Sequence, residues 1–306
     1  MNSTRKKFKT KLTRERVRSA WLFMMPMFIA LGIVAIYPLF NTIKYSFTDA
    51  RLGDLYNYNY IGWFNYETLL FYDSWWWVSV YNTFFFSIVS VSLETVIGVI
   101  FALILNNNIP ARGIVRAAIL IPWAIPTIVN AKMFQWMFNQ QFGVFNEILL
   151  DLHLISEPIA FLAYPDSAMA SAIFVDVWKT TPFITLLTLA ALQMIPAEIY
   201  ESTRIDGVSP LRVFCIITLP LIMATLVIAI SFRGVDALRV FDLLYVLTSN
   251  SRENASMSVY ARQWLVDYME VGQGSAASTL LFAFLTISTI IYLIVTRTNF
   301  DKQGVY

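Results

Sequence analysis

The chain has 306 residues, of which 58% are hydrophobic and only 14% charged. Soluble domains usually carry about a quarter charged residues, so this sequence lacks the polar side chains that a water-exposed surface needs. A net charge of only +2 gives no electrostatic case for a nucleic-acid partner. With a single cysteine, Cys215, and a single histidine, His153, the chain holds neither an internal disulfide nor a His/Cys metal cluster. The composition therefore predicts an integral membrane protein that lipid covers in part.

The first twenty residues form a basic segment that precedes an apolar run. Its positive residues are Arg5, Lys6, Lys7, Lys9, Lys11, Arg14, Arg16 and Arg18. A cleaved signal peptide would have a shorter apolar core and a small-residue cleavage site, whereas this run is long and no such site follows it. We expect residues 1–20 to be a solvated cytoplasmic tail.

Six segments are long and apolar enough to cross a bilayer as helices, which takes about 20 residues. They are residues 21–40, 83–105, 117–138, 168–194, 214–247 and 276–296. The sequence therefore predicts an all-α polytopic membrane protein of about six transmembrane helices. Its membrane domain is expected over residues 21–296, with a cytoplasmic tail over 297–306. Prolines inside several spans predict kinked helices around a cavity.

Lysine and arginine placement predicts the orientation, because these residues concentrate in cytoplasmic segments. One side would hold the basic tail together with Arg112, Arg116, Arg204, Arg212, Arg297 and Lys302. The outer loops would hold Lys44, Arg51, Arg252 and Arg262. The loop 139–166 contains acidic residues but no lysine or arginine. Both ends of the chain are therefore expected in the cytoplasm.

The outer segment 49–80 is rich in aromatic residues and ends in Trp75, Trp76 and Trp77. Aromatic rings are typical of the membrane–water boundary, which favours interface anchoring. A platform on which a sugar ring stacks is the alternative.

A short segment between the fourth and fifth spans, residues 195–212, has the pattern of two helices separated by a turn. Pro196 can open the first helix, and Gly207 permits the left-handed conformation that ends it. Ser209 is expected to cap the next helix, with Pro210 at its first position. A rigid helix that projects from a membrane bundle can act as a lever, since whatever grips it tilts the attached spans.

The same segment carries a family resemblance. Glu201-Ser202-Thr203 is followed after three residues by Gly207, and after nine more by Ile217-Thr218-Leu219-Pro220. This spacing resembles the E-A-A-x3-G-x9-I-x-L-P signature of the permease subunits of bacterial ABC importers. Ser202 and Thr203 replace the two alanines. Both are small enough to keep close packing, although their hydroxyls could alter the contact.

The resemblance extends over about residues 82–292. Segments 178–183, 192–196 and 236–248 are similar to maltose- and trehalose-type permeases of the carbohydrate branch. A glycine-rich turn usually follows the last segment in those relatives, whereas here it is replaced by Ser249-Asn250-Ser251-Arg252.

The resemblance implies a permease bundle of the ABC importer type I, which forms half of a translocation pathway in a bacterial inner membrane. It implies a sugar substrate, a di- or oligosaccharide, and an extracytoplasmic solute-binding protein. Two cytoplasmic ATPase subunits would bind ATP and Mg, because this chain has no G-x-x-x-x-G-K-[ST] phosphate loop. A second homologous permease subunit, or alternatively a second copy of this chain, would complete the pathway. The chain would thus be a transport subunit without catalysis or cofactor of its own.

The implied ATPase-coupling residues are Glu201, Ser202, Thr203, Asp206 and Gly207. Among them, Glu201 is expected to be a helix cap and docking residue, and Gly207 the sharp turn.

Ionisable residues inside membrane spans are costly and usually line water or pair with each other. In the fourth span, Asp176, Lys179, Thr180 and Phe183 fall on one helical face, with Trp178 in the same stretch. Hydroxyls, charges and an aromatic ring are what a sugar site needs. We predict that these residues line the substrate pathway.

The fifth span carries Arg233, Asp236, Arg239 and Asp242, each three residues apart, followed by Tyr245. On a straight helix this spacing sweeps half the circumference, so either Gly234 marks a bend or the upper part of the segment already lies in water. These residues could form a charged wall of the pathway or structural ion pairs between subunits, and the pattern leaves both open. The solitary Glu94 of the second span is expected to pair with a neighbouring helix.

Other functions remain open at this point. The same importer class could carry glycerol phosphate, a polyamine or a metal complex. A passive channel or secondary transporter would need no ATPase, and a membrane-embedded enzyme would need catalytic groups clustered at one depth.

Overall fold

The computed structural model describes residues 11–107 and 110–302, and their side chains from Glu15 to Thr296. The predicted tail residues Arg5 to Lys9 lie outside the described residues, as do the side chains of Arg297 and Lys302. The helices are α1 (Lys11–Leu31), α2 (Tyr37–Tyr45), α3 (Phe64–Glu67), α4 (Ser74–Asn106), α5 (Arg112–Ala124), α6 (Thr127–Met137), α7 (Val144–Asp151), α8 (Pro165–Gln193), α9 (Ala197–Ile205), α10 (Pro210–Val213), α11 (Leu219–Leu238), α12 (Asp242–Leu247), α13 (Met257–Arg262) and α14 (Val271–Lys302).

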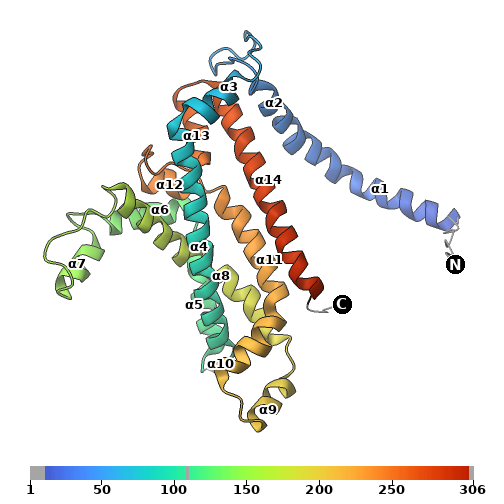
Figure 1. The fold of residues 1–306 in the computed structure, drawn as a ribbon, viewed down its shortest axis with the longest axis vertical. Helices are drawn as coiled ribbons and strands as arrows, with labels where there is room; N and C mark the ends of the chain where they lie inside the picture. Colours follow the sequence, from blue (N-terminus) through green and yellow to red (C-terminus); the bar gives the residue numbers. More distant parts are fainter. Residues whose placement is uncertain (1–10, 108–109, 303–306) are drawn as a thin grey trace.

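Short π-helical turns join several of these helices into longer rods. They cover Gly32–Ile36, Thr68–Tyr72, Phe214–Thr218 and Gln263–Asp267. Five rods in the described chain are long and apolar enough to cross a membrane, namely Glu15–Tyr45, Ser74–Asn106, Pro165–Gln193, Pro210–Leu238 and Val271–Thr296. The predicted all-helical polytopic membrane fold is confirmed (Figure 1).

The expected continuous third span is wrong in detail. It consists of α5 and α6, which meet at an angle of 91°. Pro126 follows an extended Ile125 at the corner, because proline has no N–H to continue a helix and disfavours helical geometry in the residue before it.

The bent pair still carries the chain from one end of the bundle to the other. Helix α5 follows the lower end of α4 in Figure 1. At the opposite end, Asn82 near the start of α4 donates to the Glu253 carbonyl at 2.7 Å. Asn254 donates to the carbonyl of Pro165, the first residue of α8, also at 2.7 Å. Helices α4 and α8 therefore begin at the same end, and α5 with α6 connects the two ends.

The fifth span also differs from the expectation of one helix over 214–247. Helix α11 continues through Gly234 and ends at Leu238, and α12 begins at Asp242 after a break. The bend therefore falls at residues 239–241 and not at Gly234. Ser256 donates to the Val240 carbonyl at 2.6 Å and satisfies a backbone group that the break exposes. Non-helical backbone inside a membrane requires such partners.

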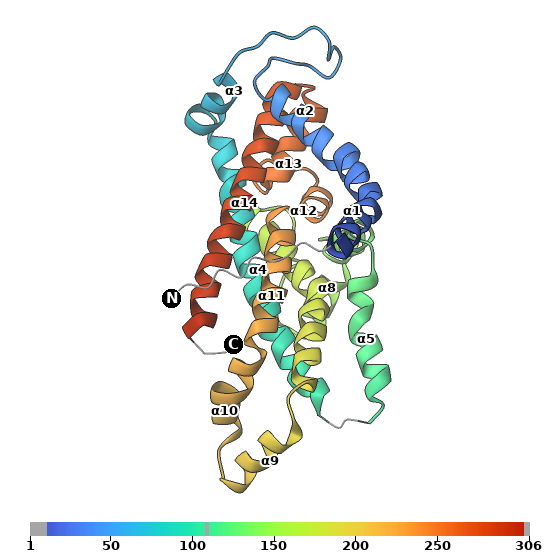
Figure 2. The same ribbon diagram turned by 90° about the vertical axis from the view of Figure 1, so that its right-hand side faces the viewer.

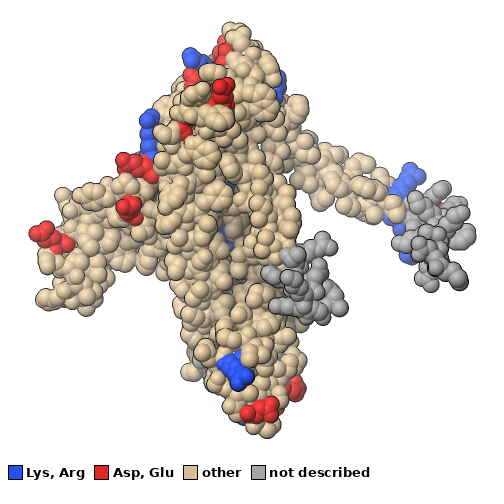
Figure 3. All heavy atoms as spheres, viewed as in Figure 1, with Lys and Arg blue, Asp and Glu red and all other residues tan. Residues whose placement is uncertain are grey.

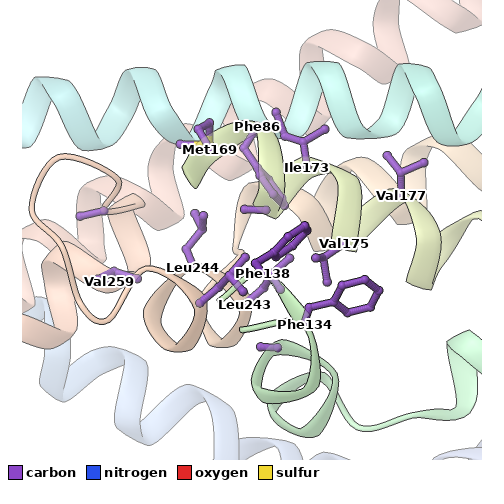
Figure 4. Packing of buried hydrophobic residues seen from close by; sticks show 14 residues of the cluster. Phe86, Phe134, Phe138, Met169, Ile173, Val175, Val177, Leu243, Leu244 and Val259 are labelled. Atoms are coloured by element: carbon purple, nitrogen blue, oxygen red, sulfur yellow. The ribbon is translucent and has the colours of Figure 1, made fainter. Parts of the chain in front are cut away.

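A hydrophobic cluster holds α12 and α6 against α8 and α4 (Figure 4). Phe134 of α6 and Phe138, which directly follows α6, lie beside Leu243 and Leu244 of α12, and Phe86 of α4 contributes to the same cluster. All five side chains are buried. This packing fixes the position of the break and of the polar residues next to it.

The first rod forms an arm: α2 contacts α14, and from there α1 extends away from the other helices (Figure 1). None of the residues in its most apolar window is buried within the chain. In the view of Figure 3, charged side chains lie mainly at the top, along the left edge and at the lower tip of the bundle, and they leave an apolar band between them. Lipid or another protein chain therefore has to cover the arm and the band.

The aromatic segment 49–80 is only partly exposed. Trp76 is completely buried beside Tyr260, so it belongs to the core rather than to the membrane interface. The Arg252 guanidinium lies 4.6 Å from the Trp75 ring centroid, in a cation–π contact. The Tyr260 hydroxyl donates to Asp73, which also caps α4 through the backbone N–H of Trp75. Burial and the adjacent carboxylate raise the pKa of Tyr260, so the phenol remains a donor.

Candidate functional site

The predicted coupling segment forms a helix–turn–helix at the lower tip of the molecule (Figures 1 and 2). Helix α9 ends at Ile205, and Gly207 has a φ of +66°, as the predicted turn requires. Two expectations are wrong. Glu201 lies in the middle of α9 and caps nothing, and Ser209 precedes α10 without a side-chain cap hydrogen bond. Pro210 alone starts α10, since its fixed φ suits the first helical position.

The coupling residues present mainly one exposed face. Glu201, Ser202 and Asp206 are exposed, whereas Thr203 is buried. The Ser202 hydroxyl donates to the Ile199 carbonyl at 2.9 Å, and Thr203 donates to the Tyr200 carbonyl at 2.8 Å. The two hydroxyls that replace alanines therefore bind within α9, which leaves the outer surface of the helix close to that of the alanine pattern.

Inside the bundle, Arg233 of α11 joins three helices through an ion network. Its Nε lies 2.7 Å from Glu94 Oε2 of α4, and its Nη2 lies 3.0 Å from Glu94 Oε1. The same Nη2 donates to Asp176 of α8, and Nη1 lies 3.3 Å from Asp236. Asp236 also pairs with Arg239 at 3.2 Å. The expected interhelical pairing of Glu94 is confirmed, and Arg233 is a structural ion-pair residue.

A cavity of about 350 Å³ opens beside this network. It is lined by Phe86, Thr127, Asp176, Lys179, Thr180, Arg233, Asp236, Ala237, Arg239, Val240, Phe241, Asp242 and Leu243. Seven of the ten residues predicted for the substrate pathway thus meet in one place. The break after α11 explains how Arg239 and Asp242 reach the same wall, which a straight helix would not allow.

The other three predicted residues lie elsewhere. Trp178 is two residues from Asp176, a rotation of about 200°, so it faces the opposite side of α8 and packs on Phe134. Phe183 shares the angular position of Asp176 but lies about 10 Å further along the helix, against Trp123. Tyr245 stacks on Phe241 at 5.3 Å, behind the cavity wall.

Sequence reasoning missed Phe86, Thr127 and Phe241 as lining residues. Phe86 has no polar signal that separates it from its neighbours in the run Phe84–Phe86. Thr127 reaches the cavity because the corner after Pro126 turns α6 sideways. The nearby Pro122 and Pro126 indicate such a corner in the sequence, but they do not predict its angle.

A second, larger cavity of about 1080 Å³ lies between α4, α5 and α8 and is mainly apolar. Residues four apart on α4 form one wall, from Tyr81 and Phe85 through to Phe101. It resembles the space between lipid-facing helices more than a site for a polar solute, which needs convergent hydrogen-bonding groups.

Comparison with known proteins assigns the chain to a family. Residues 94–301 match the family described as "Binding-protein-dependent transport system inner membrane component". The chain is 40% identical to the trehalose/maltose transport system permease protein MalF of Thermococcus litoralis, over 95% of this chain and 98% of the relative. It is 32% identical to the sulfoquinovosyl glycerol transport system permease SmoG of Agrobacterium fabrum, over 92% of this chain and 91% of the relative.

The fold agrees with that assignment. A chain of a bacterial ABC transporter for the import of the acidic polysaccharide alginate superposes with a TM-score of 0.81 at 22% identity, covering 94% of this chain and 99% of that chain. The predicted membrane permease without catalysis of its own is thereby confirmed at the level of the family. The chain belongs to the binding-protein-dependent transport system inner membrane components, the multi-pass permease subunits of ABC importers.

Proposed function

We propose that this permease forms half of the pathway of a sugar importer, and that a di- or oligosaccharide passes through the cavity beside Arg233. The observation that carries the proposal is the cavity beside the broken end of α11, where charged and hydroxyl side chains lie next to the apolar packing around Phe86 and Leu243. Trehalose, maltose and sulfoquinovosyl glycerol appear in the names of its relatives. Hydroxyl-rich solutes need donors and acceptors on several sides, and carboxylates, cations and Thr180 offer both.

Two cytoplasmic ATPase subunits bind the coupling helices, one for each permease. The exposed face of α9, at the tip farthest from the outer loops, supports this assignment. The tip and both chain ends lie in the cytoplasm, and the loops around Trp75 and Arg252 face a solute-binding protein outside. ATP binding and hydrolysis then shift the pair between inward- and outward-facing states.

The arm formed by α1 and α2 packs on a second, homologous permease. A rod of 31 residues whose most apolar window has no buried residue in its own chain is well suited to contact another one. Co-purification of the assembled importer tests this partner. Recovery of the ATPase with this permease alone would contradict the heterodimer.

Removing one charge from the cavity is expected to reduce sugar uptake about tenfold, the usual effect of losing a charged hydrogen-bond partner. Lys179→Met and Asp242→Asn each change a partly exposed lining residue outside the pairs that Arg233 makes. Uptake of labelled trehalose and maltose into vesicles that contain the whole importer measures the effect.

Lys132→Met is the matched control for this experiment. Lys132 is exposed on α6, where its Nζ lies 2.9 Å from Gln135 Oε1, outside the cavity. It should transport at the wild-type rate. If the lining variants and the control transport equally well, the cavity is not the pathway.

Cross-linking tests the coupling helix. In a Cys215→Ser background, which removes the exposed native cysteine, Glu198→Cys at the exposed start of α9 should capture an ATP-hydrolysing subunit. Leu52→Cys on the outer side is the control and should capture none. Absence of the ATPase from the α9 product would refute ATPase docking on this helix.

A further inference from the structure

Helix α9 is joined to the base of α11 by a hydrogen bond between side chains. The Tyr200 hydroxyl lies 3.2 Å from the Thr218 hydroxyl. Ser202 and Thr203, the other hydroxyl residues of α9, bind backbone carbonyls of their own helix. Tyr200 is half-buried and Thr218 is only 3% exposed, so water competes weakly for this contact.

Thr218 occupies a distinctive place on α11. It is the last residue of the π-helical turn Phe214–Thr218, which continues directly into α11. π-Helical turns hold one more residue per turn than an α-helix and occur often at functional sites. From Pro210 to Leu238 the backbone nevertheless forms one rod. A displacement applied at Thr218 therefore moves the rest of α11.

The other end of this rod reaches the cavity. Arg233 lies fifteen residues beyond Thr218, about 22 Å along the helix at 1.5 Å per residue. There it binds Glu94 of α4 and Asp176 of α8, and it lines the cavity together with Asp236. The contacts from Tyr200 to Asp176 are thus continuous through one helix.

The covalent connection between α9 and α11 is less suited to transmit a displacement. It passes through Gly207, whose left-handed φ is reached without steric cost by glycine, the residue with the greatest backbone freedom. The hydrogen bond of Tyr200 adds a second attachment to this single covalent link. Rotation of α9 about its turn is then resisted by the hydrogen bond and passed to α11.

We propose that Tyr200 is a positioning residue for transport: its hydrogen bond to Thr218 transmits the movement of α9 to α11 and hence to the cavity wall. This inference rests on the proposed docking of an ATPase on α9. The bond leaves the docking face unchanged, since it lies on the side of α9 that faces the membrane bundle.

The test compares sugar uptake with ATP hydrolysis in proteoliposomes that contain the complete importer and its binding protein. Tyr200→Phe and Thr218→Val each remove one hydroxyl and keep the shape of the side chain. Each should lower the sugar imported per ATP hydrolysed about fivefold, the factor that corresponds to one hydrogen bond. The double variant should be no lower than either single variant.

Two control variants separate coupling from packing. Ser231→Ala removes a hydroxyl of α11 that donates to the Val227 carbonyl of its own helix, and Thr218→Ser keeps the hydroxyl at the π-helical turn. Both should retain the wild-type ratio. Wild-type ratios in Tyr200→Phe and Thr218→Val, or additive losses in the double variant, would overturn the proposal. If Thr218→Val does not assemble, Tyr200→Phe alone decides.

Cross-linking from Glu198→Cys in the same variants distinguishes a failure of the proposed role of Tyr200 from a failure of ATPase docking on α9. Capture of the ATPase together with an unchanged ratio refutes the role of Tyr200 and leaves ATPase docking intact. No capture of the ATPase in the Cys215→Ser, Glu198→Cys protein that keeps both Tyr200 and Thr218 would refute docking itself.

Discussion

Replacing Arg233 with methionine is expected to destabilise the protein by about 3–5 kcal/mol, because Glu94 and Asp176 would remain buried without their cation. The Arg233 side chain is 4% exposed and Glu94 is fully buried, so water cannot replace the lost partner. Size-exclusion chromatography of the detergent-solubilised protein after heating measures the loss.

Arg239→Met is the matched control for Arg233→Met. Arg239 pairs with Asp236 at 3.2 Å, but the two side chains are 64% and 57% exposed. Exposed ion pairs contribute about 0–1 kcal/mol, so this variant should unfold near the wild-type temperature. Equal stability of the two variants would show that the buried network contributes nothing.

Neutralising the network as a whole should recover part of the stability. The triple variant Glu94→Gln, Asp176→Asn and Arg233→Met leaves no buried charge unpaired, and polar or apolar replacements of buried ion pairs are often tolerated. The triple variant should therefore be more stable than Arg233→Met alone. The opposite order would mean that the arginine acts by packing rather than by charge.

Gly272→Ala is expected to cost about 3 kcal/mol through overpacking. A Cβ at Gly272 would lie 2.0 Å from the Thr48 carbonyl oxygen, a backbone atom that the Asn65 amide also holds at 2.9 Å. The backbone N–H of Gly272 donates to the Ala50 carbonyl at 3.0 Å. The start of α14 would therefore be forced away from the segment that follows α2.

Gly272→Ala should also weaken assembly with the proposed second permease. The contact of Gly272 with Thr48 and Ala50 holds the segment that follows α2, and it therefore sets the direction of the arm. Thermal unfolding and co-purification with the second permease measure the two effects. Gly234→Ala is the control, since a Cβ there meets nothing within 4 Å. A membrane helix should accept it without loss. If the two alanines behave alike, the close approach at Thr48 relaxes freely.

Much of the fold could be predicted because the bilayer imposes strong constraints on sequence. Long apolar runs located most of the spans, and the Pro196 and Gly207 signals located helix α9. Pairing of Glu94 was also predictable, since a carboxylate inside a membrane needs a partner. That partner, Arg233, lies 139 residues away and was visible only after folding.

The errors share one physical cause, which is that local backbone breaks depend on distant contacts. The break after Leu238 exposes a carbonyl at Val240 that Ser256, sixteen residues later, satisfies. Proline at position 26 leaves α1 helical, whereas Pro126 accompanies a 91° corner. Composition alone does not separate these cases. Similarly, three adjacent tryptophans differ in burial because Tyr260 packs on Trp75 and Trp76, whereas Trp77 stays exposed.

The exposed arm has a consequence for how much of this protein a cell can accumulate. If the arm packs on the proposed second permease, a newly inserted copy presents α1 and α2 to lipid until that partner arrives, and unassembled subunits are substrates for proteases. Steady-state abundance should then follow the synthesis of whichever permease is scarcer, which makes this long apolar rod a determinant of subunit stoichiometry.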